Sequence, residues 1–463
     1  MRRHVALLLL LSISALLALG QTSEDMKFCD DQSNPDQSLI HCTAEIESGQ
    51  VAMPNLAVAF LNRGNAYYNK HDYDSAIGDF DQAIKLDPHY SLAFFNRGNA
   101  YYCKRQYDRA IQDYDQAIRL NPAHFGAFVG AGEVLAAKRD YDGAIPIYNE
   151  AIRLNPSYSP AFNARGWAYF NKGNLDFAIQ DYDQAIRLNP GDVSAITNRG
   201  WVYHGKGNYD RAIQDYDQAI RLDPSYAPAF TNRGWTYYNK GNYDQAIQDY
   251  DQAIRLNPRF ALAFYNRGWF YYKKGSYDQA IQDYDQAIRV NPTFALAFSN
   301  RGSAYWKKAN GAATADRDRA MQDFDEAIRL DPSQAIAFRY RGVAYLSLHQ
   351  PDRAIPDFDQ EIKLNSRDSS AFLNRGIAYY QKGELDLAIQ DYTQSIQLAP
   401  DFQGFFNRAA ALFSLGEFAA AQADLEKAVE SEPDRVYAFL WLYLAQSRAG
   451  QPARGELKKQ RPV

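Results

Sequence analysis

The sequence predicts an all-α fold, a solenoid of stacked helix pairs. A motif of about 34 residues recurs along the chain, and each copy contains two stretches whose apolar residues have helical spacing. A closing Asn-Pro or Asp-Pro step forbids continuation of the second helix and turns the chain into the next copy. The spacing is set by the closing residues Pro88, Pro122, Pro156, Pro190, Pro224, Pro258, Pro292, Pro332, Ser366, Pro400 and Pro433.

Within one copy the two helices are separated by a turn. In the copy that begins at Ala227, Gly241 is expected to end the first helix. Asp244 is expected to cap the second helix, its side chain accepting a hydrogen bond from a free backbone N–H. Small residues recur in each helix and permit close helix approach, while tyrosine and phenylalanine fill the space between the helices. The small positions include Gly64, Gly98 and Gly234 in first helices and Ala76, Ala110 and Ala246 in second helices.

An arginine beside the glycine and an aspartate in the second helix occur together, as in Arg233 and Asp249. The copy with Ala131 lacks the arginine, and it also lacks the aspartate, having Ile147 instead. Because an unpartnered buried charge is costly, this joint loss predicts that the two side chains form an ion pair within each repeat.

The expected order of elements follows from these patterns. Residues 1–20 have a basic start, an apolar run and small residues before Gln21, which is typical of a signal peptide. Residues 21–56 are expected to hold an N-terminal capping helix, and residues 57–435 eleven repeats. Extra residues near 309–317 should bulge between the helices of one repeat. Residues 436–449 are expected to form a C-terminal capping helix, and the polar tail 450–463 is expected to be disordered.

In these residues the chain resembles the tetratricopeptide repeat (TPR) family, and specifically the exported bacterial members of that family. The resemblance covers more than four-fifths of the sequence and rests on the repeat length and the small/large pattern. It implies a right-handed α-α superhelix with a concave groove lined mainly by first helices.

The composition narrows the function classes. A net charge of −5 argues against nucleic-acid binding, which needs a basic surface to neutralise phosphates. The seven histidines are scattered, and no metal-ligand spacing, phosphate-binding loop or nucleophile elbow is found. We therefore expect no enzyme activity, no metal and no cofactor.

The cysteines and the N-terminus bear on location. Cys29 and Cys42 precede the repeats at a spacing that fits paired helices, so a disulfide between them is expected, with Cys103 left as a free thiol. We expect a secreted or periplasmic protein with no membrane span after signal cleavage. The alternative is an uncleaved signal that anchors the chain to a membrane.

The expected partner site is the groove. One aromatic column directly follows the glycine, and a second lies one helical turn further on. An asparagine column precedes the arginine and resembles the asparagine ladder with which some superhelical repeat proteins hold an extended peptide backbone. The aromatic residues of the predicted groove are Trp167, Trp201, Trp235, Trp269, Trp306, Phe170, Tyr238 and Tyr272, and the asparagines are Asn198, Asn232, Asn266 and Asn300.

Two functions follow from these columns. The favoured one is a non-catalytic scaffold that binds an extended peptide or protein in the groove, outside the cytoplasm. Peptide or protein binding is favoured because tryptophan and tyrosine supply much of the affinity at interfaces. The alternative is a polysaccharide-binding or export-assisting module whose aromatic faces stack on sugar rings. Both columns could instead be structural, the aromatics packing between first helices and the asparagines bonding between helices.

Overall fold

The protein is described by a computed structural model for residues 34–49, 52–309 and 314–450. This part of the chain consists of helices and short turns, with no strand, so the all-α prediction is confirmed. It divides into an N-terminal body, residues 1–236, and a C-terminal body, residues 237–463, which are described separately below. The boundary lies inside helix α13 (Ala227–Asn239).

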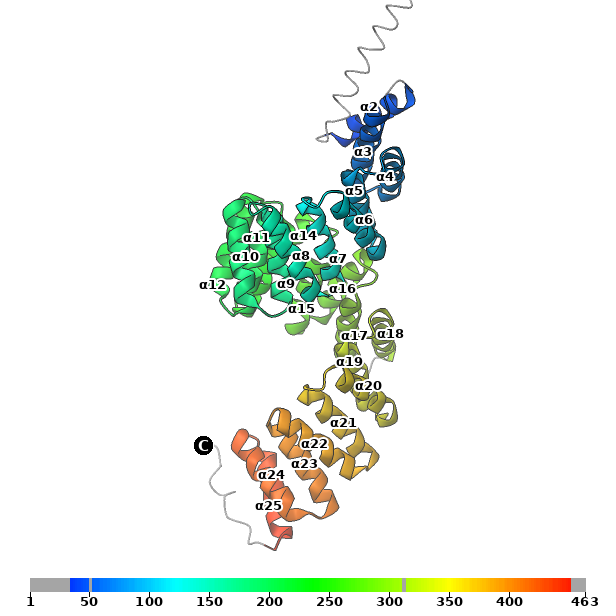
Figure 1. The fold of residues 1–463 in the computed structure, drawn as a ribbon. Helices are drawn as coiled ribbons and strands as arrows, with labels where there is room; N and C mark the ends of the chain where they lie inside the picture. The colour runs from blue at the N-terminus through cyan, green and yellow to red at the C-terminus, as the bar shows by residue number, and fades with distance from the viewer. Residues whose placement is uncertain (1–33, 50–51, 310–313, 451–463) are drawn as a thin grey trace, which may run out of the picture. The chain divides into compact units, whose positions relative to one another are not determined.

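Helices of similar length alternate with short turns in the N-terminal body (Figure 1). They are α2 (Pro35–Glu47), α3 (Met53–Asn69), α4 (Tyr73–Leu86), α5 (Ser91–Cys103), α6 (Tyr107–Leu120), α7 (Phe125–Ala137), α8 (Tyr141–Leu154), α9 (Ser159–Asn171), α10 (Leu175–Leu188), α11 (Val193–Gly205) and α12 (Tyr209–Leu222).

The C-terminal body continues the same alternation. Its helices are α14 (Tyr243–Leu256), α15 (Ala261–Lys273), α16 (Tyr277–Val290), α17 (Ala295–Ala309), α18 (Thr314–Leu330), α19 (Ala335–Ser347), α20 (Pro351–Leu364), α21 (Ser369–Lys382), α22 (Leu385–Leu398), α23 (Phe402–Leu415), α24 (Phe418–Ser431) and α25 (Val436–Arg448).

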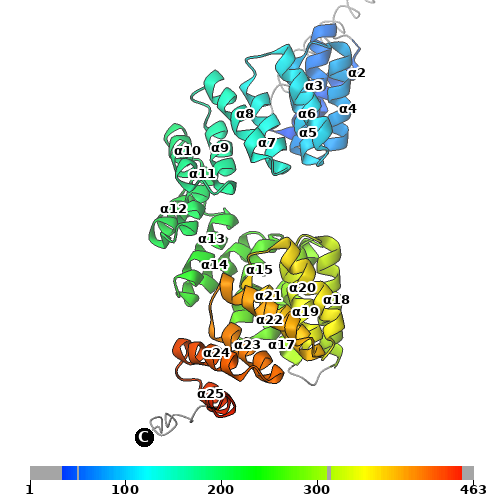
Figure 2. The ribbon, with the colours of Figure 1, turned by 60° about the horizontal axis from the view of Figure 1, so that its bottom comes forward.

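Consecutive helices pack as pairs, α3 with α4 through α11 with α12 in one body and α15 with α16 through α23 with α24 in the other (Figure 2). First helices also contact the first helices of neighbouring repeats, as α5 contacts α7 and α7 contacts α9. Each body is therefore a solenoid in which the first helices line a surface of their own. Helices α2 and α25 lie at the two ends of the series and pack on α3 and α24.

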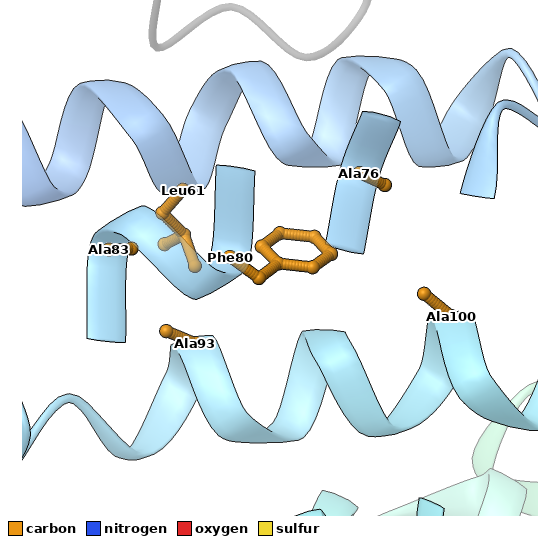
Figure 3. Close-up of a cluster of buried hydrophobic side chains, with 6 residues drawn as sticks. All are labelled: Leu61, Ala76, Phe80, Ala83, Ala93 and Ala100. Carbon is orange, nitrogen blue, oxygen red and sulfur yellow. The ribbon is translucent and has the colours of Figure 1, made fainter. Parts of the chain in front are cut away.

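The core forms where the second helix approaches the glycine of the first. In the first repeat, Phe80 points into the space bounded by Leu61 of α3 and by Ala93 and Ala100 of α5 (Figure 3). A Cβ added to Gly64 would lie only 2.6 Å from the Phe80 ring. Any side chain there would displace the ring, which explains why glycine recurs at this position.

The turn within each repeat uses a left-handed residue. Gly173, Gly207 and Gly241 have φ of 79°, 74° and 86°, a conformation open to glycine without a steric penalty. Arg139 occupies the equivalent position with φ of 64°, and so do His71, Arg105 and His349.

Two expectations about helix ends are wrong. The residue before α14 is Asn242, so Asp244 lies inside the helix rather than at its N-cap. Aspartates at this position instead reach the next repeat, as Asp108 does with Lys138 at 2.6 Å. The extra residues near 309–317 do not all bulge, because α18 already begins at Thr314 and absorbs part of them as helix.

The predicted Arg–Asp ion pair is confirmed in nine repeats. In each, the arginine Nε and Nη2 donate to the two carboxylate oxygens of one aspartate at 2.6–3.0 Å. Arg233 and Asp249 lie in different bodies, and their predicted pair stays a prediction. The pairs are Arg63–Asp79, Arg97–Asp113, Arg165–Asp181, Arg199–Asp215, Arg267–Asp283, Arg301–Asp323, Arg341–Asp357, Arg375–Asp391 and Arg408–Asp424.

The same arginines also join neighbouring repeats. The Nη1 of Arg199 donates to Asp183 of the preceding repeat at 2.6 Å, and the Nη1 of Arg165 donates to Asn149 of the preceding repeat at 2.6 Å. Eight of these nine arginines tie a second helix to its own first helix and to the repeat before it, and Arg63 of the first repeat reaches Thr43 of α2 instead.

Several expectations concern residues that the structure does not describe. The signal peptide at residues 1–20, Cys29 and the tail beyond Gly450 lie outside the described residues. Among the helices that are described, none has the length and apolar content needed to cross a bilayer.

Candidate functional site

The predicted groove residues of the N-terminal body lie on first helices. Trp167 is on α9, Trp201 on α11 and Trp235 on α13. Trp167 and Trp201 directly follow Gly166 and Gly200, which pack on the rings of Tyr182 and Tyr216. None of the three tryptophans is buried, and the Trp167 side chain is 43% exposed. The indoles therefore contribute little to the core formed on the other side of these helices.

Each indole for which a ring contact is known lies against the aromatic residue one turn further along its own helix. Trp167 stacks on Phe170 with ring centroids 5.5 Å apart, and Trp201 stacks on His204 at 5.0 Å with an angle of 2° between the rings. These contacts are within one helix, so they do not hold neighbouring repeats together. They fix the orientation of the indole and present a flat aromatic surface.

His204 also has a structural contact. Its Nδ1 lies 3.0 Å from Oγ1 of Thr236, whose hydroxyl donates to the carbonyl of Asn232. Burial lowers the pKa of His204, so the imidazole is neutral at neutral pH. A neutral ring keeps the stacked pair with Trp201 free of charge.

In the C-terminal body Trp269 shows the same arrangement, whereas Trp306 packs against the core cluster that contains Phe324. Trp269 stacks on Tyr272 with centroids 5.7 Å apart, and the Lys273 ammonium lies 4.6 Å from the Trp269 ring centroid. Trp306 lies under the guanidinium of Arg317 at 5.7 Å. Both tryptophans are half-buried.

Tyr238, unlike Trp167, packs against the core. Its ring lies 5.5 Å from Tyr243 and 6.2 Å from Phe270, and it packs against the cluster that contains Tyr250. Of the two aromatic columns, the one directly after the glycine is therefore the more accessible.

The asparagine column is partly used by the fold. Asn198 donates its amide to Asn163 of the preceding repeat at 3.0 Å, and Asn300, which is buried, donates to the Tyr265 hydroxyl at 2.8 Å. Asn232 and Asn266 are half-buried. The bonds made by Asn198 and Asn300 join repeats, and the amide N–H₂ of Asn300 is not available to a ligand.

One further candidate residue is not among the predicted groove residues. It lies in the aromatic column, the series of positions that directly follow the recurring glycine of each first helix. That column contains Glu133 on α7, one repeat before Trp167. The sequence does mark Glu133 as unusual, because no other repeat, from the one with Asn65 to the one with Ala410, has an acidic residue directly after the glycine position. The surroundings of Glu133 depend on side chains from several helices, which sequence reasoning does not place.

No group of three or more histidine, cysteine or acidic side chains capable of holding a metal ion occurs in the described part of the chain. The site features that the structure does provide are exposed aromatic faces and single polar groups on a surface of stacked first helices. This combination defines a helical repeat scaffold, a class of protein that binds partners along such a surface.

Family models place the chain within that class. Models described as tetratricopeptide repeat match residues 57–90, 96–159, 159–192, 181–214, 231–293, 271–315, 369–402 and 403–435, and one described as TPR repeat matches 202–241. Together they cover more than half of the sequence. The chain belongs to the tetratricopeptide repeat family and is a protein–protein interaction scaffold of the kind that is typically non-catalytic.

One solved structure supports the fold over most of the chain, and a second shows sequence similarity over part of it. The Cut9–Hcn1 hetero-tetramer of the APC/C matches 93% of this chain and 94% of its own chain, with 16% identity and a TM-score of 0.51. YrrB, described as a TPR protein with an unusual peptide-binding site, matches 41% of this chain and 97% of its own, with 27% identity and a TM-score of 0.32. No curated protein sequence matches the chain significantly.

Proposed function

We propose that this scaffold binds an extended polypeptide on its first-helix surface, outside the cytoplasm. The observation that carries the proposal is that the tryptophans on α9 and α11 are not buried: Trp167 is 43% exposed and Trp201 is half-buried. Large unburied aromatic side chains are uncommon on a surface that only faces solvent and are enriched where partners bind.

The variation between repeats supports a binding role over a packing role. The position of Trp167 and Trp201 is held by Asn65 and Asn99 in earlier repeats and by Ser303 and other small or aliphatic residues in later ones. The helices of those repeats form and pack without an aromatic residue there. The tryptophans are thus not required by the fold, which leaves their exposed faces for recognition.

The test compares two variants of the full chain. Trp167→Ala/Trp201→Ala should lose binding to peptides selected from a random displayed library, while its circular dichroism and thermal unfolding stay close to those of the parent. Phe177→Ala is the matched control, because Phe177 is a 55% exposed aromatic residue on the second helix α10, where its ring contacts Tyr169. It should keep full binding.

Two results would overturn the proposal. A loss of several kcal/mol of stability in the double variant, as core aromatic truncation produces, would show that the indoles are structural. Selective binding of soluble cell-envelope glycans, with no peptide selected, would favour the polysaccharide-binding alternative.

The location is proposed from the sequence. A signal at residues 1–20 would direct export and allow Cys29 and Cys42 to pair; Cys42 is fully buried against Ala59, and Cys103 is a free, exposed thiol. Protein recovered from outside the cytoplasm should begin at Gln21 and contain one reactive thiol. A chain that keeps Met1 or has three reactive thiols would contradict this part of the proposal.

A further inference from the structure

A cavity of about 370 Å³ opens between the first helices α7 and α9 of the N-terminal body. Glu133 of α7 and Trp167 of α9 face it from residues that are equivalent in adjacent repeats. Tyr102, Tyr148 and Asn163 also line the cavity. The volume is within the usual range for sites that bind small groups.

The cavity wall is acidic. Besides Glu133 it includes Asp192, which caps α11 by accepting a hydrogen bond from the Ala195 N–H at 2.9 Å. No lysine, arginine or histidine lines it. Two carboxylates without a cation leave a net negative charge in a partly enclosed space.

Glu133 makes no hydrogen bond or ion pair with any of the described residues. Its burial raises the pKa of the carboxyl from 4.5 to about 7. Glu133 is half-buried, and a carboxylate that is partly removed from water normally receives a donor or a cation from the fold, because an unpaired buried charge is costly. The fold supplies neither here.

The repeat that contains Glu133 is also the one that departs from the common pattern. It has Ala131 and Ile147 in place of the Arg–Asp ion pair that nine other repeats form. The residues equivalent to Glu133 in the flanking repeats, Asn99 and Trp167, are neutral. The charge is therefore a property of this one position and not of the repeat.

We propose that the cavity receives a lysine or arginine side chain of the bound polypeptide, with its cationic group on the Glu133 carboxylate and its stem along the Trp167 ring. The inference rests on the proposed peptide-binding function and specifies the partner's chemistry. A cation provides the missing charge partner for Glu133, and the tyrosine and tryptophan rings can add cation–π attraction. A basic side chain satisfies both features of the wall at once.

The experiment uses the full chain and a random peptide library displayed on phage. Peptides selected by the parent protein should be enriched in one lysine or arginine, and Glu133→Gln should bind them at least about tenfold more weakly, which corresponds to about 1.4 kcal/mol. Glutamine keeps the shape of the side chain and removes only its charge. The ligand provides a second variant, because changing the enriched lysine to norleucine in a synthetic peptide alters the same contact without touching the protein.

The pH dependence separates a charge contact from a shape effect. Cation binding needs ionised Glu133, so affinity for the lysine peptide should fall as the pH decreases through about 7, with proton release on binding. Asp192 also lines the cavity, and the other titratable groups around Glu133 are phenols. Burial raises the pKa values of these phenols, so they stay neutral in this range; they belong to Tyr68, Tyr102, Tyr114, Tyr148 and Tyr158. The norleucine peptide and the Glu133→Gln variant should show a much flatter profile.

The possible outcomes distinguish this inference from the proposed function. Selected peptides without basic enrichment, or equal binding by the parent and Glu133→Gln, would overturn the basic-residue pocket while leaving peptide binding intact. Failure of the parent protein to select any peptide would contradict the proposed function and, with it, this inference.

Discussion

Replacing Arg165 with alanine tests what the Arg–Asp ion pair does for the solenoid. Arg165 Nε and Nη2 donate to Asp181 at 2.8 and 2.6 Å, and Nη1 donates to Asn149 of the preceding repeat at 2.6 Å. Asp181 is only 5% exposed. This repeat is the best choice because the second partner, Asn149, is neutral, so Arg165→Ala leaves a single carboxylate without its cation.

The expected loss is large because the carboxylate stays buried. Removing one partner of a buried ion pair costs about 3–5 kcal/mol, mostly from the uncompensated charge. Burial raises the pKa of Asp181, and Arg165 opposes that effect. Without Arg165 the pKa rises further, so the folded protein binds the proton more tightly than the unfolded chain. The loss should therefore be greatest at pH above the new pKa and smaller in acid.

A second variant makes the prediction specific. Arg165→Ala/Asp181→Ile copies the repeat that naturally has Ala131 and Ile147. It removes both charges and should cost less than half as much as Arg165→Ala alone, since no buried charge remains. Urea unfolding followed by circular dichroism gives both values, provided that the slope with urea is unchanged. A cost below about 1 kcal/mol for Arg165→Ala, or equal costs for the two variants, would refute the reasoning.

Three further changes test local features of the fold. The Tyr182 hydroxyl is buried without a partner among the described residues, whereas Tyr114 donates to Asn99 at 2.7 Å; Tyr182→Phe should be neutral or stabilising, and Tyr114→Phe should cost about 1 kcal/mol in urea unfolding. Arg139→Gly should raise the melting temperature by relieving about 1 kcal/mol of left-handed strain, and an unchanged or lower value would contradict this. Glu133→Gln should stabilise the chain by up to about 3 kcal/mol at pH 8 and not at pH 4, because the parent loses stability as the pH rises from 4.5 through about 7; equal effects at both pH values would exclude an ionised, desolvated Glu133.

Much of the fold was predictable because each feature is repeated. The contact between Gly166 and the Tyr182 ring, where an added Cβ would lie 2.9 Å from the ring, follows from glycine and aromatic columns that recur through the sequence. The Arg–Asp ion pair was predictable from a single repeat that lacks both residues. Repetition shows which positions belong together before any coordinate is known.

The helix ends were less predictable because the sequence pattern does not fix the first helical residue. Both Asn242 and Asp244 are good capping residues, and only the position of the left-handed turn at Gly241 decides between them. The structure places Asn242 at the cap. Side-chain capping bonds then form in some repeats, such as that of Asp140 with the Gly143 N–H at 2.9 Å.

The candidate site was predictable as a set of positions but not as a set of partners. The columns place Trp167 and Trp201 on first helices, yet they do not show that Asn300 is buried on Tyr265. The bonding of each asparagine depends on the residue it meets in the preceding repeat, which is Asn163 for Asn198 and Tyr265 for Asn300. Those neighbours vary from repeat to repeat, so the period carries no information about them.

The positions that keep the period and those that break it have different physical roles. A glycine under an aromatic ring, or an arginine on a buried aspartate, is required wherever two helices pack in this way, and such residues recur in most repeats. The residue directly after the glycine meets no such requirement, and it changes from asparagine to glutamate to tryptophan along the N-terminal body. A solenoid can therefore vary its partner surface one repeat at a time at little cost to stability. Glu133 is the exception, because burial raises the pKa of its unpaired carboxyl and ionisation is therefore expected to cost stability, which a cationic ligand would compensate.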